Sequence, residues 1–123
     1  MLLKHRYHKF INYFLKINPN PTTELIFKND YELLVSVILS AQCTDKRVNA
    51  TTPLLFSKFP SISSLARANR DDIFYIIKSI SYPSNKSKYL LGMAKMLKNE
   101  YNYIIPSNID ELQKLPGVGR KTA

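Results

Sequence analysis

The chain has little of what would tie it to a disulfide-bonded or metal-bound class of protein. Its 123 residues include one cysteine, Cys43, which excludes an internal disulfide and a cysteine-rich metal site within the chain. His5 and His8 lie three residues apart on an expected helix, but no acidic or cysteine residue is near them, so no metal site is expected there. Cys43 has no plausible base beside it in the sequence and is interpreted as a packing residue.

Long hydrophobic runs are also missing. The longest apolar stretch, residues 33–41, is interrupted by Ser36 and Ser40 and is far shorter than the roughly 20 residues that a membrane span requires. The first 23 residues contain no acidic residue, but they also contain no serine and only one arginine, Arg6, so a transit peptide is rejected. We therefore expect a cytoplasmic protein without a membrane partner.

Acidic residues are scarce relative to basic ones. The chain has 9 Asp and Glu against 18 Lys and Arg, which gives a net charge of +9. Such an excess does not define a fold, but it favours an acidic partner, either nucleic acid or an anionic membrane. Of these two partners, the charge favours nucleic acid.

Apolar residues recur at helical spacing through nearly the whole chain, and no segment shows the sustained alternation of a strand. The pattern predicts one all-α domain of six or seven short helices, at 1–18, 31–39, 44–55, 61–68, 71–80, 86–99 and 106–114, with a turn at 82–85. Asn29 and Glu32 have the spacing of a capping box before the most apolar helix, which we expect to be central and buried. Thr44-Asp45 offers a cap for the next helix, which Pro53 is expected to bend or shorten.

The most informative motif is Leu115-Pro116-Gly117-Val118-Gly119-Arg120-Lys121-Thr122-Ala123. Two short helices joined by such a turn form a helix-hairpin-helix, in which backbone N–H groups and the start of the second helix face a phosphate. Contacts of this kind position DNA without reading its bases. Lys121 either neutralises that phosphate or, when its amine is neutral, acts as a nucleophile. An ordinary turn between two helices is the simpler alternative.

These nine residues resemble the hairpin of the endonuclease III family, which are DNA glycosylases with AP lyase activity that remove oxidised pyrimidines. Further similarity lies in 19–25, in 31–45 with its Leu39-Ser40-Ala41-Gln42-Cys43-Thr44-Asp45 string, and in Asn85-Lys86-Ser87-Lys88, so that it covers essentially the whole chain. The resemblance implies base excision repair on double-stranded DNA that carries damaged pyrimidines or abasic sites. It also implies a monomeric, nucleoid-associated protein.

The resemblance assigns roles to individual residues. Lys121 matches the catalytic lysine, whose amine must be neutral to attack the sugar C1′, displace the base and form a Schiff base before β-elimination breaks the strand on the 3′ side. Gln42 matches the glutamine that enters the base stack after a nucleotide is flipped out. The hairpin residues implied to bind DNA are Leu115, Gly117, Val118, Gly119 and Arg120.

One loop departs from the family's pattern. Ser81, Tyr82 and Pro83 stand where the family has a glycine, an apolar wedge and an aromatic residue. Tyr82 is therefore expected to bind DNA by stacking in the wedge position. Asp45 is expected to act as a helix cap.

The family pattern also extends past Lys121. Its catalytic aspartate and the four cysteines of its [4Fe–4S] cluster lie beyond that lysine, so no cofactor is expected within this chain. We expect an all-α, helix-hairpin-helix DNA glycosylase six-helix domain truncated before its last helix, with residues 107–123 forming a hairpin cut within its second helix.

Three functions stay open at this stage. The chain is the N-terminal part of an endonuclease III enzyme, or a remnant that keeps at most weak nonspecific DNA binding. The third alternative is a small DNA-binding protein that never was an enzyme. Gln42 and Lys121 argue against this third alternative, because a pure binding protein needs neither.

Overall fold

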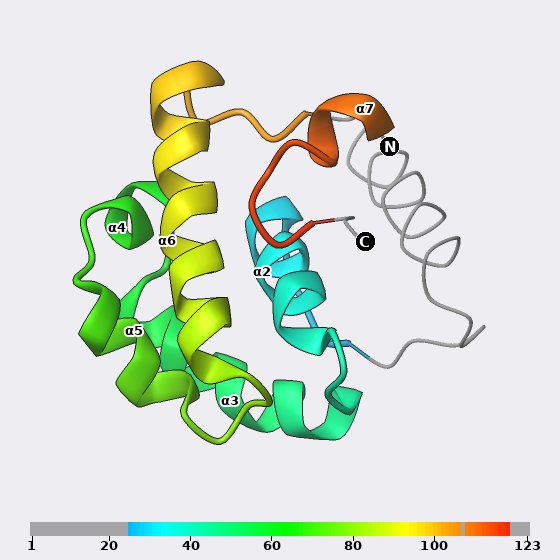
Figure 1. Cartoon of the computed structure of the whole chain (residues 1–123), viewed down its shortest axis with the longest axis vertical. Coiled ribbons are helices and arrows are strands. Elements are labelled where there is room, and N and C mark those ends of the chain that lie inside the picture. The colour runs from blue at the N-terminus through cyan, green and yellow to red at the C-terminus, as the bar shows by residue number, and fades with distance from the viewer. Residues whose placement is uncertain (1–24, 107, 119–123) are drawn as a thin grey trace.

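The computed structural model describes residues 25–106 and 108–118, and within them every regular element is a helix (Figure 1). The helices are α2 (Asp30–Ser40), α3 (Asp45–Lys58), α4 (Ile62–Ala66), α5 (Arg70–Ile77), α6 (Pro83–Glu100) and α7 (Ile109–Leu112). This arrangement confirms the all-α class. The predicted helix at 1–18 lies outside the described residues.

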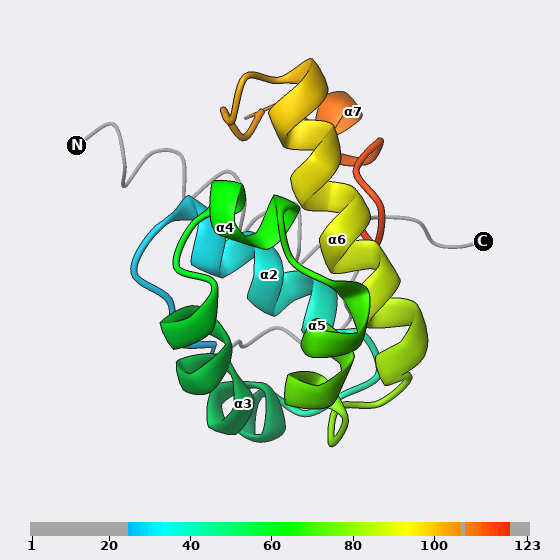
Figure 2. The ribbon, with the colours of Figure 1, turned by 90° about the vertical axis from the view of Figure 1, so that its left-hand side faces the viewer.

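The helices pack around α2, which lies in the middle of the fold with α6 beside it (Figures 1 and 2). Both α4 and α5 pack against α6, while α3 contacts α2 and α5. Every residue of α2 from Tyr31 to Ser40 is buried, as the apolar character of this segment predicts. In the part of the chain that is described, no helix combines the length and the apolar character that crossing a membrane would take.

The start of α2 is capped by its own sequence. The side chain of Asn29 accepts a hydrogen bond from the backbone N–H of Glu32 at 2.9 Å, as the capping-box spacing predicts. The return bond differs from the prediction, because Glu32 Oε1 accepts from the N–H of Lys28 at 3.0 Å and not from that of Asn29. The bond from Glu32 therefore reaches Lys28, one residue further toward the N-terminus than in a capping box.

Helix α3 differs from the prediction in its N-cap and in its length. Its N-cap is Thr44, whose hydroxyl accepts from the N–H of Arg47 at 3.2 Å, while Asp45 is the first residue of the helix. The negative charge of Asp45 at that position suits the helix dipole. Pro53 does not shorten the helix, which continues to Lys58, because a proline removes one N–H donor while the neighbouring bonds can still form.

Helix α6 begins at Pro83, so the prediction of a turn at 82–85 is wrong for most of its length. Proline is well suited to the first position of a helix, where its fixed φ matches and its missing N–H has no helical acceptor. The backbone N–H of Lys86 then bonds the carbonyl of Tyr82 at 3.1 Å and closes the first turn.

The short helices begin at side-chain caps. Ser61 and Ser64 form a reciprocal capping box before α4, and Asn69 accepts from the N–H of Asp71 at 2.8 Å before α5. Helix α5 ends at Ile77, three residues before the predicted end. Helix α7 is also shorter than predicted, because after Leu112 the backbone continues in tight turns up to the hairpin.

The hairpin is tied to the end of α6 by one pair of side chains. The Tyr101 hydroxyl donates to Oε1 of Glu111 in α7 at 2.5 Å, and Lys114 Nζ binds the other carboxylate oxygen at 3.2 Å. The hydrogen bond to Glu111 raises the pKa of Tyr101 to about 12, and the same bond lowers the pKa of Glu111. The Tyr101–Glu111 bond links α7 to the residue that ends α6.

Candidate functional site

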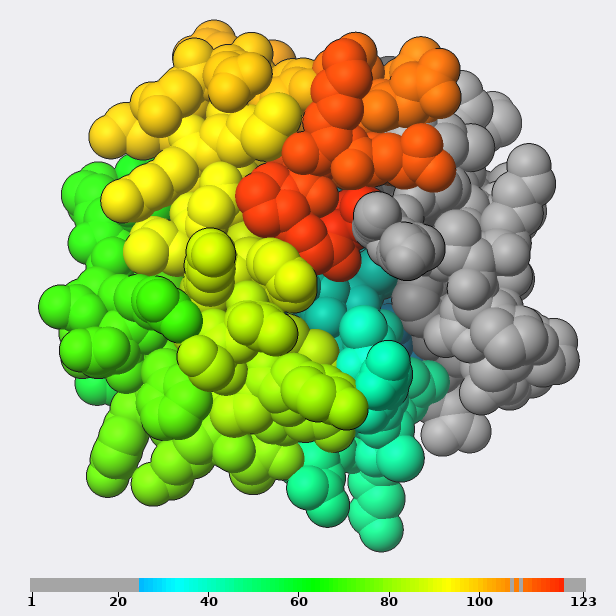
Figure 3. Space-filling model, in the orientation of Figure 1, coloured from blue at the N-terminus to red at the C-terminus, as the bar shows by residue number. Residues whose placement is uncertain are grey.

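Three segments far apart in the sequence meet on one face of the molecule: the turn after α2, the turn before α6, and the hairpin turn at 115–118. Figure 3 shows the hairpin in red at the centre of this face, next to the end of α2 and the first half of α6. A Cβ placed on Gly117 would lie 3.0 Å from Ile38 Cγ2 and 2.9 Å from Tyr89 Cβ, so the hairpin turn contacts both helices directly. The described part of the hairpin therefore packs against the two helices, α2 and α6, whose ends carry the Gln42 and Tyr82 turns.

Gln42 occupies the turn between α2 and α3. Its backbone is left-handed, with φ of 55°, and its side chain is exposed. A positive φ is uncommon for a residue other than glycine, although a single residue can adopt it in a turn. The turn is closed by the N–H of Cys43, which bonds the Ser40 carbonyl at 3.0 Å. Gln42 thus points outward from a short, hydrogen-bonded turn.

Tyr82 occupies the matching position before α6. It also has a left-handed backbone, with φ of 54°, and 60% of the residue's surface is exposed. No side chain caps the helix at this residue. A left-handed conformation costs a bulky residue about 1–2 kcal/mol. The comparison with the family pattern placed its glycine at Ser81, but the residue with positive φ is Tyr82.

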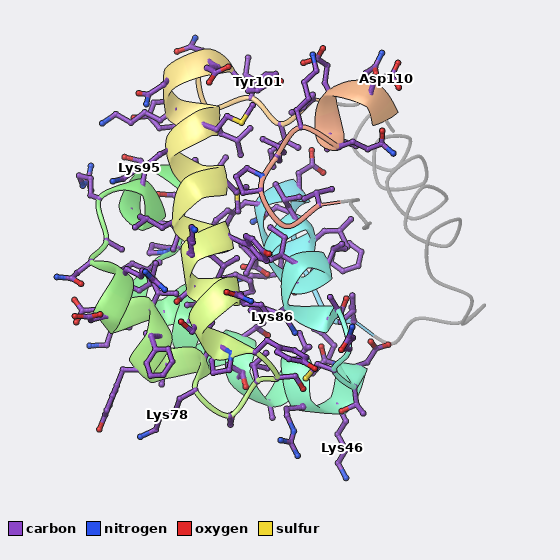
Figure 4. The ribbon with its side chains drawn as sticks, viewed as in Figure 1. Lys46, Lys78, Lys86, Lys95, Tyr101 and Asp110 are labelled. Carbon is purple, nitrogen blue, oxygen red and sulfur yellow. The ribbon has the colours of Figure 1, made fainter. Side chains whose placement is uncertain are left out.

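Lys86 is buried beneath this surface, and its role was missed by the sequence reasoning. It lies between α2 and α6 (Figure 4), is only 4% exposed, and its Nζ donates to the carbonyl oxygens of Leu39 at 2.8 Å and Ala41 at 2.5 Å. Burial lowers the pKa of Lys86, and the nearby Cys43 partly opposes that shift. A signal was present in the sequence, because Lys86 stands on the same helical stripe as the buried Leu90 and Met93.

Cys43 packs half-buried against the core, as expected. The structure also brings Lys86 of α6 within electrostatic range of Cys43. The two residues are distant in the sequence and are brought together only by the packing of α6 on α2.

The hairpin residues divide into core and surface. Leu115 and Val118 are 2% and 1% exposed, so their side chains support the turn from within and do not reach solvent. The N–H of Val118 is itself bonded to the carbonyl of Leu115 at 3.1 Å. Gly117 is exposed and left-handed, with φ of 82°. Three predicted site residues, Gly119, Arg120 and Lys121, lie outside the described residues.

Positive charge surrounds the Tyr82 turn. Arg47 donates to the carbonyl of Ser79 at 3.0 Å, and Arg70 donates to the hydroxyl of Ser84 at 3.1 Å, which brings one guanidinium from α3 and one from α5 to the same loop. Both acceptors are neutral oxygen atoms. The side chain of Lys78 extends from the end of α5 in the same region, over the ring of Tyr75 (Figure 4). Such a cluster attracts phosphate groups.

The helical fold and the glycine turn between α7 and the residues that follow define a domain of the helix-hairpin-helix class. A family model described as "HhH-GPD superfamily base excision DNA repair protein" matches residues 35–122. The chain belongs to this superfamily.

Relatives within the superfamily carry a common name. The chain is 44% identical over 116 residues to endonuclease III of Rickettsia felis, a match that covers 94% of this chain and 54% of the relative. It is 42% identical over 120 residues to endonuclease III of Buchnera aphidicola subsp. Schizaphis graminum, covering 98% and 57%. The chain thus spans about half the length of the curated relatives it matches.

A solved structure agrees with these sequence matches. The chain superposes with a TM-score of 0.77 and 37% identity on endonuclease III trapped as a covalent intermediate with DNA, over 97% of this chain and 56% of the other. The helix-hairpin-helix glycosylase fold expected from the sequence is therefore confirmed.

The [4Fe–4S] cluster that the family resemblance implies does not fit the residues at hand. Such a cluster takes four cysteine thiolates, and the sequence has one cysteine. Within residues 25–106 and 108–118, no three His, Cys, Asp or Glu side chains come together as a group that could hold a metal ion.

Proposed function

We propose that this chain forms the lesion-recognising half of a base excision repair enzyme, a DNA glycosylase with AP lyase activity of the endonuclease III type. The observation that carries the proposal is that Gln42, in the turn after α2, and Tyr82, in the turn before α6, are both exposed and left-handed, and that Lys86 is bonded to both turns. Endonuclease III trapped covalently on DNA is the structural relative named above, which supports double-stranded DNA as the partner.

The proposed recognition step uses both turns. A base inside a duplex is stacked and out of reach, so it must be rotated out before its sugar can be attacked. The flat amide of Gln42 fills the vacated space and bonds the base left unpaired, while the Tyr82 ring stacks beside it. Positive groups around the Tyr82 turn, including Arg47 and Arg70, hold the phosphates of the distorted strand.

The proposed reaction proceeds through Lys121. Its neutral amine forms a bond to C1′, and the C1′–base bond breaks with its electron pair leaving on the base, which takes up a proton. Opening of the sugar ring gives a Schiff base. Loss of a proton from C2′ then expels the 3′ phosphate, and water releases the lysine. We propose that the half of the relatives not matched by this chain supplies the carboxylate that assists these proton transfers.

Borohydride trapping tests the chemistry. We expect a chimera of this chain with the C-terminal half of the Rickettsia felis relative to be trapped on abasic-site DNA through Lys121. The 123-residue chain alone should bind such DNA with strong salt dependence and should not be trapped.

The substitution Lys121→Ala in the chimera should abolish trapping while leaving nonspecific binding mostly unchanged. Trapping that survives in this variant would overturn the nucleophile assignment. Efficient trapping by the chain alone would show that the unmatched half is not required. DNA binding without trapping in either form would favour the non-catalytic remnant.

A further inference from the structure

Lys86 is hydrogen-bonded to the turn that carries Gln42 and to the turn that carries Tyr82. Its backbone N–H donates to the carbonyl of Tyr82 at 3.1 Å. Its side chain crosses to α2, where Nζ donates to Leu39 and to Ala41, the residue immediately before Gln42. One residue thereby connects the main chain of one turn to the main chain of the other.

The chemistry of this contact is unusual for a buried position. The ammonium group bonds two neutral carbonyl oxygens at the end of α2, where a helix leaves carbonyls without internal partners and favours a cation. Removing a cation from water is costly, and an apolar side chain of similar length would fill the same space without that cost. Lys86 stands on the apolar stripe of α6, so packing alone does not require a charge there. The role of the ammonium group is therefore to donate hydrogen bonds to the two carbonyl oxygens at the end of α2.

We propose that Lys86 is a positioning residue that sets the spacing and orientation of the Gln42 turn relative to the Tyr82 turn, so that both side chains enter one lesion site. This inference rests on the proposed function. Lys86 itself has no contact with DNA in this account, because its amine faces the interior between α2 and α6.

The test replaces Lys86 with methionine, which keeps the length of the side chain and removes the charged donor. Lys95→Met is the matched control, because Lys95 is an exposed lysine further along the same helix and its loss removes the same charge. Binding is measured by fluorescence anisotropy with a duplex that contains a tetrahydrofuran abasic analogue and with the undamaged duplex. We expect the preference for the abasic duplex to fall about tenfold in K86M and to stay unchanged in K95M.

A second measurement needs no DNA. The amide of Cys43 is bonded to Ser40 in the Gln42 turn, whereas the amides in the middle of α2 lie within a buried helix. In K86M, hydrogen exchange at the Cys43 amide should become about tenfold faster while exchange at Val37 stays the same. A role in general stability would accelerate both amides together.

The outcomes separate the inference from the proposed function. A wild-type chain without preference for the abasic duplex contradicts the proposed function, and the Cys43 exchange rate then decides alone whether Lys86 orders the turn. Wild-type preference that persists in K86M, with unchanged exchange at Cys43, overturns the inference. Loss of cooperative folding in both K86M and K86Q also overturns it, because Lys86 would then be a residue of general core stability.

Discussion

Gly117 in the hairpin turn packs directly on the side chain of Tyr89 in α6. A Cβ added to Gly117 would lie 2.9 Å from Tyr89 Cβ and 3.0 Å from Ile38 Cγ2, and the glycine has φ of 82°. Real Cβ atoms essentially never approach another heavy atom as closely as 2.9 Å, and a distance of 3.0 Å is tighter than most Cβ contacts. Glycine is thus required here for its backbone conformation and for the absence of a side chain, and it seats the hairpin against both α2 and α6.

Substitution of this glycine should destabilise the fold. We expect Gly117→Ala to lower the free energy of unfolding by about 2 kcal/mol or more, since the left-handed backbone alone costs about 1–2 kcal/mol and the contact with Tyr89 adds to it. Gly92→Ala is the control, because its Cβ would also meet the hairpin, at 3.2 Å from Pro116 Cγ, but from an ordinary helical backbone. A gain in helix propensity of about 1 kcal/mol opposes the tight contact there. Urea unfolding followed by circular dichroism measures both variants, and equal effects would contradict this explanation.

The Tyr101–Glu111 bond should make stability depend on pH at both ends of the scale. The pKa of Glu111 is lowered in the folded state, so its contribution is present above its usual value of 4.5 and is lost as the pH falls through the lowered value. The pKa of Tyr101 is raised from 10.0 to about 12, so its contribution is present below pH 10 and is lost as the pH rises through 12.

Thermal unfolding of Tyr101→Phe against the wild type measures this effect. The wild type should be the more stable protein between about pH 5 and pH 10, and the difference should shrink outside that window. The control is Tyr103→Phe, which removes a hydroxyl from an exposed tyrosine two residues away. A difference between wild type and Tyr101→Phe that is constant with pH would contradict the assigned bond.

Two buried serines of α2 should respond differently to removal of their hydroxyl groups. Ser40 Oγ donates to the carbonyl of Val37 at 2.8 Å, whereas Ser36 Oγ is buried and, among the described residues, has no hydrogen-bond partner. Ser40→Ala should therefore be about 1 kcal/mol less stable than Ser36→Ala, which should match or exceed the wild type. Chemical denaturation of the two variants in parallel cancels their shared gain in helix propensity. The reverse order of stability would disprove the assignment.

At Tyr82, stability and DNA recognition should change in opposite directions. Tyr82→Gly relieves the left-handed conformation, and after allowing for the flexibility of glycine in the unfolded chain the variant should be up to about 1 kcal/mol more stable. The same change removes the ring that we propose to stack on DNA, so affinity for an abasic duplex should fall about tenfold. Tyr82→Ala keeps the backbone strain and serves as the control. A Tyr82→Gly variant that binds the abasic duplex as well as the wild type would refute the wedge role.

The helices were predictable because each buries an apolar face at regular spacing, and the buried α2 follows directly from its composition. The helix boundaries near prolines were less predictable, since the effect of a proline depends on its position in the helix. Pro53 lies inside α3 without ending it, and Pro83 starts α6 where a turn was expected. Sequence alone does not distinguish these positions.

The candidate site was predictable only in part. Gln42 and Tyr82 were found through family resemblance, but their left-handed backbones depend on how the turns close in three dimensions. The role of Lys86 was not foreseen, because the carbonyl groups that it binds lie on a helix distant in the sequence. The burial of Leu115 and Val118 was not foreseen either. A local pattern can show that a side chain is buried, as the stripe with Leu90 and Met93 does for Lys86, but it does not show which distant groups that side chain binds.

The backbone groups at the two ends of α2 are hydrogen-bonded by side chains that lie at very different distances along the chain. Asn29 caps the start within three residues, whereas Lys86 reaches the Leu39 carbonyl across 47 residues. Closing the longer loop costs more chain entropy, so we expect the first turn of α2 to form early in folding and the Gln42 turn to be completed only when α6 docks. Folding kinetics of Asn29→Ala and Lys86→Met, read as φ-values, would test this order. By the same reasoning, the Gln42 turn is the end of the central helix that opens most readily while the core stays closed.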